Sequence, residues 1–307
     1  MPRLAFGTGT KWYKTNGNES RDIREDFVEC VVSALEAGFT HIDTAEMYGT
    51  EREVGVALDR FLSKSGKKRS DVFITAKIAD PANLSLRCKQ SLERLGPAMA
   101  GYIDLYLLHS PFWDYFSPDS SQPMKTVWTE LESLVHSGLV RSIGVSNFRI
   151  QDLQALADTN PSIPPACNQI EHHAYLQQLD LIQFGKTVFP GMQVSAFGQL
   201  RPLQYFAEKG DVKAVVDEIA SRKSVTASQV LIAWGLQLGF VQVTTTDKKE
   251  RLVEAVAAQS IELTEQEMDA IRNAGLGHLH RYHMCLPGVH ELVKFEMTVD
   301  EFYAAWK

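Results

Sequence analysis

The chain has 307 residues, 44% of them hydrophobic, and a formal net charge of −7. This length and composition allow one large core, and the negative charge argues against nucleic acid as a partner. No apolar run reaches the length of a membrane span and the first residues do not resemble a signal peptide, so we expect a cytoplasmic protein without membrane contact. The scattered cysteines lack zinc-ligand spacing, which predicts free thiols and no metal site: Cys30, Cys88, Cys167 and Cys285.

Short apolar segments alternate with amphipathic segments along the chain. We expect strands at Leu4–Gly7, Phe39–Ile42, Val72–Ala76, Tyr102–Leu108, Val140–Gly144, Ala166–Ile170, Gln193–Ala196 and Val241–Thr244. We expect helices between them, among others at Asp22–Ala37, Thr50–Leu62, Lys125–Ser137, Leu176–Lys186, Asp211–Ser221 and Thr226–Leu238. This alternation predicts a parallel sheet that closes into a (β/α)8 TIM barrel, with residues 1–307 as a single domain.

An open, doubly wound sheet is the alternative that the same alternation allows. Such a sheet would carry a glycine-rich phosphate-binding turn after its first strand. The segment Gly7-Thr8-Gly9-Thr10 lacks the third glycine of that turn, which favours the barrel.

Titratable side chains follow three successive predicted strands. Asp43, Lys77 and His109 stand at the carboxyl ends of the second, third and fourth strands, and Tyr48 lies on the loop after Asp43. Each of them alone would more often be a cap, a solvated residue or a core residue. Because the carboxyl ends of barrel strands converge on one face, we expect these side chains to meet there.

Motifs spread over nearly the whole chain resemble those of the aldo-keto reductases. They are Gly7-Thr8-Gly9-Thr10, His41-Ile42-Asp43-Thr44-Ala45 with Tyr48-Gly49, the segments 103–111 and 138–148, and Asn168-Gln169-Ile170-Glu171-His172-His173. Within the family, the segments 8–12 and 243–246 are most similar to the fungal and yeast conjugated polyketone and ketopantoyl lactone reductases. The resemblance implies a TIM barrel that uses NADPH, with Asp43, Tyr48, Lys77 and His109 as its catalytic residues.

These four residue types suit the reduction of a carbonyl group. Negative charge develops on the carbonyl oxygen when hydride reaches the carbon, and that oxygen needs a proton or strong hydrogen-bond donors. Tyr48 would donate the proton, and His109 would donate a hydrogen bond to the same oxygen. Since free tyrosine is a weak acid at neutral pH, we expect Lys77 to stabilise its anion and Asp43 to hold Lys77 in place.

The resemblance also implies a nicotinamide site at the ends of the later strands. Ser146, Asn147 and Gln169 would hydrogen-bond the carboxamide, which offers both donors and acceptors. Phe197 would stack on the nicotinamide ring. Other expected cofactor contacts come from Thr10, Gly198, Leu200, Thr244, Thr245 and Thr246.

The phosphate end of the cofactor is expected after the last strands. Many relatives have a lysine where this chain has Thr245. Lys248 and Arg251 are then the cations left for the adenosine 2′-phosphate, so we favour NADPH. Asp247 and Glu250 beside them keep NADH possible.

Aromatic residues near the predicted strand ends suggest an apolar substrate, for which we expect Trp12, Phe112 and Trp113 as walls. Substrate choice should depend on the loops at 112–123 and 199–210 and on the tail from about residue 275 to 307, which we expect to form a lid. Within the tail, His278, His280, His283 and His290 leave a metal site conceivable but not favoured, and Thr298–Trp306 suggests a short helix that begins with a capping box.

The sequence thus predicts an NAD(P)H-dependent reductase of a ketone or aldehyde, such as a diketone, a keto-lactone or a biosynthetic ketone. Its partners would be a small carbonyl compound and, at most, further copies of itself in a weak oligomer. Two alternatives stay open: NAD-dependent oxidation of an alcohol, and a cofactor-binding subunit that senses redox state with little turnover.

Overall fold

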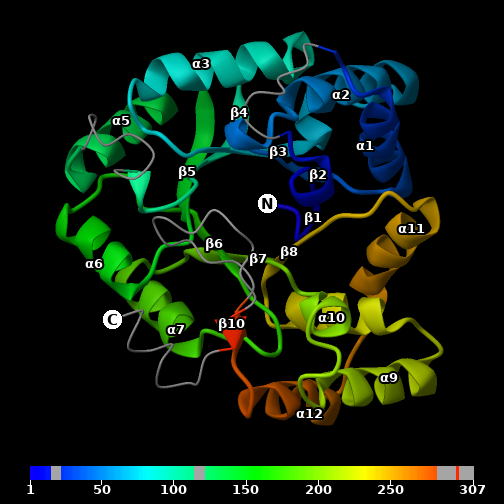
Figure 1. Ribbon diagram of the computed structural model, residues 1–307. Helices are drawn as coiled ribbons and strands as arrows, with labels where there is room; N and C mark the ends of the chain where they lie inside the picture. The colour runs from blue at the N-terminus through cyan, green and yellow to red at the C-terminus, as the bar shows by residue number, and fades with distance from the viewer. Residues whose placement is uncertain (15–21, 114–121, 282–294, 297–307) are drawn as a thin grey trace.

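The structure is a computed structural model that describes residues 1–14, 22–113, 122–281 and 295–296. Parallel strands follow one another around a closed barrel in chain order, and β8 pairs with β1 (Figure 1). They are β1 (Leu4–Gly7), β2 (His41–Asp43), β3 (Phe73–Ile78), β4 (Ile103–Leu108), β5 (Val140–Ser146), β6 (Cys167–Glu171), β7 (Gln193–Phe197) and β8 (Val241–Thr244). The predicted TIM barrel is confirmed.

Helices surround the strands (Figure 1). They are α1 (Glu25–Ala37), α2 (Glu51–Ser65), α3 (Leu84–Leu95), α5 (Met124–His136), α6 (Ile150–Asp158), α7 (Leu179–Val188), α8 (Arg201–Gln204), α9 (Val212–Lys223), α10 (Ala227–Gln237), α11 (Lys249–Ala257) and α12 (Glu265–Leu276). Short 3-10 turns include η1 (Thr10–Trp12), η2 (Glu46–Tyr48), η3 (Arg69–Asp71), η4 (Pro97–Met99) and η6 (Ala258–Ser260). Turns η1 and η2 lie on the loops that follow β1 and β2.

Side-chain alternation along the strands separates the barrel interior from the surface that the helices cover. His41 and Thr75 share the interior, since His41 Nε2 and Thr75 Oγ1 lie 2.8 Å apart. Two residues further along the same strands, Asp43 and Lys77 share that face at the carboxyl ends. Ile42 and Ala76, which stand between these residues, belong to the hydrophobic cluster that packs the barrel against its helices. The two-residue repeat of side chains along a strand therefore places Asp43 and Lys77 at the barrel mouth.

Two helices begin three residues later than the sequence predicts: α1, expected from Asp22, begins at Glu25, and α7 shows the same delay. The segment that starts at Leu176 was expected to be helical, but α7 begins only at Leu179. Gln178 adopts a left-handed conformation with a φ of +49°, and its side chain donates a hydrogen bond of 2.6 Å to the backbone oxygen of Glu171. The preceding residues form a tight turn instead, with an isolated bridge between His173 and Leu176.

Cys30, Cys88 and Cys167 are buried and free, as predicted; Cys285 lies outside the described residues. Within the described ranges, no helix is both long enough and apolar enough to cross a membrane. At the start of the tail, β9 (His280–Arg281) pairs with β10 (Phe295–Glu296) in antiparallel fashion. The helix expected at Thr298–Trp306, and the histidines at 283 and 290, lie outside the described residues.

Candidate active site

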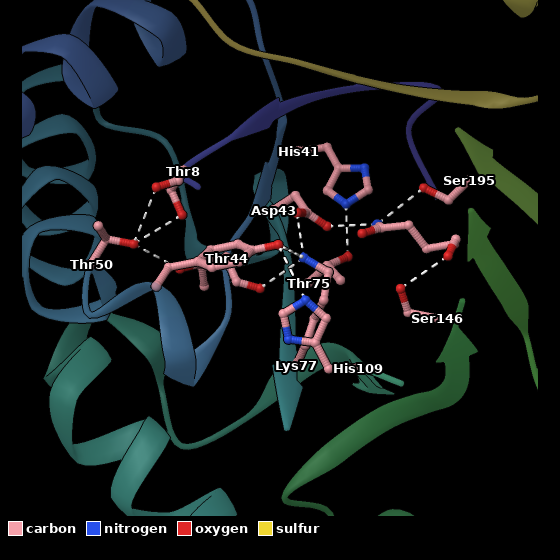
Figure 2. A network of polar contacts seen from close by, with 12 residues as sticks. Thr8, His41, Asp43, Thr44, Thr50, Thr75, Lys77, His109, Ser146 and Ser195 are labelled. Carbon is pink, nitrogen blue, oxygen red and sulfur yellow. Dashed lines mark hydrogen bonds and ion pairs between the residues drawn. The ribbon is translucent and has the colours of Figure 1, made fainter. Parts of the chain in front are cut away.

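The titratable residues predicted from the strand ends meet at the mouth of the barrel. Lys77 Nζ lies 2.5 Å from Asp43 Oδ1 and 3.3 Å from the Tyr48 hydroxyl. The same hydroxyl lies 3.5 Å from His109 Nε2. Figure 2 shows Asp43, Lys77 and His109 directed toward one another from neighbouring strands. Tyr48 therefore stands between a cation and an imidazole.

Local backbone structure fixes the position of Tyr48. It ends η2, and the following Gly49 turns the chain with a φ of +69°. The backbone N–H of Lys14 donates a hydrogen bond of 3.0 Å to the Tyr48 carbonyl, which ties the loop after β1 to the loop after β2. Gly9 faces the ring closely, because a Cβ at this position would lie only 3.1 Å from Tyr48 Cζ. Glycine in the sequence motif thus leaves room for the tyrosine ring.

The charges of the site are set by burial and by the Lys77–Asp43 pair. Burial alone would lower the pKa of Lys77, but the charges of Asp43 and Tyr48 and their hydrogen bonds raise it above its ordinary value, so the ammonium stays charged. Burial raises the pKa of Tyr48, and the charge of Lys77 offsets only part of that rise. The sequence predicts that Lys77 makes Tyr48 more acidic. The charge of Lys77 does lower the pKa of Tyr48, but burial raises this pKa by more. Tyr48 consequently keeps its proton at neutral pH.

A buried hydrogen-bond network extends from Asp43 across the barrel to β5, β6 and β7 (Figure 2). The side-chain nitrogen of Gln169 donates to Asp43 Oδ2 at 2.8 Å and to Ser195 Oγ at 3.2 Å. Ser146 Oγ donates to the Gln169 carbonyl at 2.9 Å, and Asn147 Nδ2 donates to the His109 carbonyl at 3.0 Å. The residues expected at the nicotinamide end are thus joined to the residues around Tyr48.

Ser195 belongs to this network but was not predicted. It stands two residues before Phe197 on β7 and therefore on the same face of the strand, which is the signal that sequence reasoning could have used. Phe197 is the last residue of β7 and is half-buried.

A pocket lies between the end of β8 and the start of α11. Its lining includes Leu200, Thr244, Thr245, Thr246 and Arg251. The Thr245 hydroxyl is buried without a hydrogen-bond partner among the described residues. Hydroxyl groups, a guanidinium and a helix N-terminus suit a phosphorylated ribose, so the residues present fit the phosphate end of a dinucleotide.

The other expected cofactor residues lie on the loops that follow β1, β7 and β8. Lys248 precedes α11 and is exposed. Thr10 is exposed on η1 with a φ of +56°, and Gly198 follows β7 with a φ of +79°. Asp247 forms an ion pair with Lys11, which joins the loop after β8 to the loop after β1.

The expected substrate walls fall into different environments. Trp113 is buried, and its indole N–H donates to the Gln122 carbonyl at 3.2 Å. Phe112 is half-buried, with the Arg149 guanidinium 4.7 Å from its ring centre. Trp12 is only 4% exposed and stacks on Phe27 of α1 with ring centres 4.6 Å apart. Since this ring packs into the core, Trp12 offers a substrate little exposed surface.

Sequence reasoning missed an aromatic residue next to it. Tyr13 is 39% exposed, and its ring centre lies 6.0 Å from that of Tyr48. Its position directly after Trp12 could have suggested Tyr13 as a residue of the site. Two adjacent aromatic residues in a sequence, however, do not show which of them faces the core.

Comparisons with known proteins agree with this geometry. The aldo/keto reductase family model matches residues 3–275. An NAD/NADP-dependent indole-3-acetaldehyde reductase of Schizosaccharomyces pombe is 37% identical, over 92% of this chain and 95% of the relative. An NADPH-dependent alpha-keto amide reductase of Saccharomyces cerevisiae is 34% identical, over 91% of this chain and 88% of the relative.

Solved structures of aldose and aldo-keto reductases have the same fold as this chain. The aldose reductase of Schistosoma japonicum superposes with a TM-score of 0.78 at 30% identity, covering 96% of this chain and 95% of its own. An aldo-keto reductase of Bombyx mori in complex with NADP gives a TM-score of 0.75 at 27% identity, with 89% of each chain covered. The predicted family is confirmed: the chain is an oxidoreductase that belongs to the aldo/keto reductase family.

Proposed function

We propose that this protein reduces a ketone or aldehyde to an alcohol with NADPH, and that Tyr48 donates the proton. The observation that carries this proposal is the position of the Tyr48 hydroxyl, 3.3 Å from Lys77 Nζ and 3.5 Å from His109 Nε2 at the barrel mouth. When bound, the nicotinamide cofactor supplies the hydride that reaches the carbonyl carbon.

The protein groups act on the carbonyl oxygen. The hydroxyl of Tyr48, which keeps its proton at neutral pH, transfers that proton to the developing oxyanion. His109 donates a hydrogen bond to the same oxygen and orients it. The charge of Lys77 stabilises the tyrosine anion left after transfer, and Asp43 holds the ammonium at 2.5 Å.

Three polar residues would orient the carboxamide of the cofactor. Both side-chain amide protons of Gln169 are already donated, to Asp43 and to Ser195, so its side-chain oxygen Oε1 is the group left to accept from a carboxamide N–H. The Asn147 nitrogen likewise donates to the His109 carbonyl and to Ser146, which leaves its oxygen for the same use. Phe197 would offer its ring face to the nicotinamide.

NADPH is favoured over NADH by the pocket at the end of β8. Arg251 and the Thr245 hydroxyl line this pocket and suit the adenosine 2′-phosphate. The charge of Asp247, which would repel a phosphate, is compensated by Lys11. Relatives are named as NADPH-dependent or as using either cofactor, which supports NADPH with NADH as a second choice.

The substrate would be an apolar or aromatic carbonyl compound. The Tyr13 ring lies near that of Tyr48, and Phe112 and Trp113 stand on the loop that follows β4. Aromatic walls suit an apolar body beside the carbonyl better than a polyol. Relatives named for indole-3-acetaldehyde and for alpha-keto amides support this class.

Steady-state turnover of the purified protein tests the proposal. The panel should contain an aromatic aldehyde, an alpha-keto amide, a diketone, a keto-lactone and, as a polar control, xylose, each with NADPH and with NADH. We expect NADPH oxidation with the apolar carbonyls and a much lower kcat/KM for xylose. NADPH binding without turnover of any carbonyl would favour a redox-sensing subunit, and turnover only of alcohols with NAD would favour the oxidative alternative.

A further inference from the structure

A buried ion pair joins the carboxyl ends of β6 and β7, beside the expected nicotinamide end of the site. Glu171 is the last residue of β6 and is 1% exposed. Its carboxylate contacts the guanidinium of Arg201, the first residue of α8. In the sheet register, Glu171 stands directly beside Phe197, the last residue of β7.

Arg201 also lies against Phe197 and the turn that follows it. Its guanidinium carbon is 5.6 Å from the centre of the Phe197 ring. The backbone N–H of Arg201 donates a hydrogen bond of 3.0 Å to the Gly198 carbonyl. A Cβ on Gly198 would lie 2.9 Å from the same guanidinium, so glycine allows the side chain to fold back under the turn.

Glu171 is built to stay ionised. Burial by itself would raise the pKa of its carboxyl group, but the charge of Arg201, a hydrogen bond from His173 and the charge of Arg281 together lower it well below its ordinary value. His173 Nε2 lies 3.1 Å from Glu171 Oε1, and this histidine is fully buried. The carboxylate is therefore a fixed point to which the guanidinium of Arg201 is held.

We propose that Arg201, held by Glu171, is a positioning residue that fixes the ring of Phe197 for the nicotinamide end of the cofactor. This inference rests on the proposed role of Phe197 in stacking. A half-buried ring at the end of a strand, next to a glycine turn, has several orientations open to it. A guanidinium that contacts the ring, and is itself anchored by a buried carboxylate, removes most of them.

Binding of two ligands to the purified protein tests this inference. NADPH carries the nicotinamide, whereas adenosine 2′,5′-bisphosphate carries only the adenosine and phosphate end. We expect Arg201→Met to weaken NADPH by about threefold to tenfold, the scale of one aromatic stacking contact, and to leave the bisphosphate unchanged. Arg201→Lys should recover part of the loss, because lysine keeps the charge but lacks the planar guanidinium.

The chain offers a matched control at the other end of the barrel. Arg69 pairs with the buried Asp104 at 2.6 Å, and its guanidinium lies 4.4 Å from the centre of the Tyr102 ring. Asp104 stands near the amino end of β4, far along the strand direction from the site. Arg69→Met should lower the melting temperature and leave the affinity for both ligands unchanged. If Arg201→Met does not fold, the neutral pair Glu171→Gln with Arg201→Met replaces it in the same measurements.

Phe197→Leu separates the inference from the proposal beneath it. Weaker NADPH binding in both Phe197→Leu and Arg201→Met, with the bisphosphate unaffected, supports the inference. Weaker binding in Phe197→Leu alone overturns the role of Arg201 and leaves the stacking proposal intact. No effect in Phe197→Leu rejects the stacking and the inference with it. Equal weakening of both ligands by Arg201→Met would mean that Arg201 supports the phosphate end or the fold, which also overturns the inference.

Discussion

Lys77 is fully buried, and a buried ammonium is tolerated only when its charge is compensated. Asp43 provides this compensation, and the same lysine reaches the Tyr48 hydroxyl. One side chain therefore contributes both to the stability of the barrel mouth and to the chemistry proposed for Tyr48. These two contributions can be separated by comparing a variant in which only Lys77 is replaced with one in which both Asp43 and Lys77 are replaced.

Lys77→Met should lower the free energy of unfolding by about 3–5 kcal/mol, because it leaves Asp43 buried without its cation. Turnover should fall by about a hundredfold or more, since the tyrosine anion loses its stabilising charge. The double variant Asp43→Asn with Lys77→Met should regain much of the stability without regaining turnover. Urea unfolding and steady-state kinetics on both variants provide the measurement. A double variant that turns over substrate normally would remove Lys77 from the mechanism.

Arg251 and Lys248 differ in their relation to the phosphate pocket. Arg251 lines it, while Lys248 is exposed at the start of α11. We expect Arg251→Ala to weaken NADPH by roughly 1.5–3 kcal/mol and Lys248→Ala to have a smaller effect. Neither change should affect NADH, which has no 2′-phosphate. Parallel titrations with both cofactors decide the matter, and equal weakening of NADPH and NADH would show that the phosphate is held elsewhere.

At the scale of single elements, the loop after β4 carries the residues expected to select the substrate. Trp113 closes this loop through its indole hydrogen bond to the Gln122 carbonyl. Trp113→Ala should change the ranking of bulky and small ketones by about 1–3 kcal/mol in relative kcat/KM, with cofactor affinity unchanged. Trp113→Phe keeps an aromatic ring but loses the hydrogen bond, so it separates the packing of the ring from the closure of the loop. An unchanged ranking in both variants would mean that the pocket lies elsewhere.

Element boundaries show where sequence patterns stop being informative. The strand ranges were predicted to within two residues, because buried parallel strands read as apolar runs. The start of α7 was missed, since a non-glycine residue in the left-handed conformation, Gln178, depends on a tertiary hydrogen bond to Glu171. The side-chain directions on η1 were missed for a similar reason: packing against Phe27 places Trp12 in the core and leaves Tyr13 at the site.

At the scale of the whole molecule, the alternation of strands and helices was enough to predict the closed barrel. The meeting of Asp43, Tyr48, Lys77 and His109 followed from that topology together with the family resemblance. The face on which Ser195 lies follows from its spacing to Phe197, but its hydrogen bond to Gln169 and the Glu171–Arg201 pair could not be predicted, because contacts between elements depend on register. The single domain with a lid at about residues 275–307 stays a proposal.

Buried histidines predict how the stability of the whole barrel depends on pH. Burial lowers the pKa of His41 to about 4 and that of His172 to about 3, from an ordinary value of 6.5. Between the folded pKa of each histidine and its ordinary value of 6.5, the unfolded chain binds more protons than the folded chain. Stability therefore rises with pH in this range. Stability should therefore be fully present above about pH 6.5 and be lost as the pH falls toward 4, by up to about 3 kcal/mol for each histidine.

Urea unfolding from neutral pH down to about pH 4 measures this loss. His172 stacks on Trp234, and His172→Leu removes its proton site while keeping an apolar side chain. The variant should show a shallower dependence of stability on pH across this window. If the stability of the variant depends on pH as steeply as that of the unchanged protein, protonation of His172 does not contribute to the loss of stability.

The proton-donor role of Tyr48 is tested most directly by a single-turnover measurement. The rate of NADPH oxidation by a reactive ketone is compared, at saturating cofactor, between the unchanged protein and Tyr48→Phe. We predict a fall of about a hundredfold or more in this rate with NADPH affinity unchanged, because the hydroxyl serves the carbonyl oxygen and not the dinucleotide. A Phe variant that reduces the ketone at nearly the original rate would contradict the proposed function.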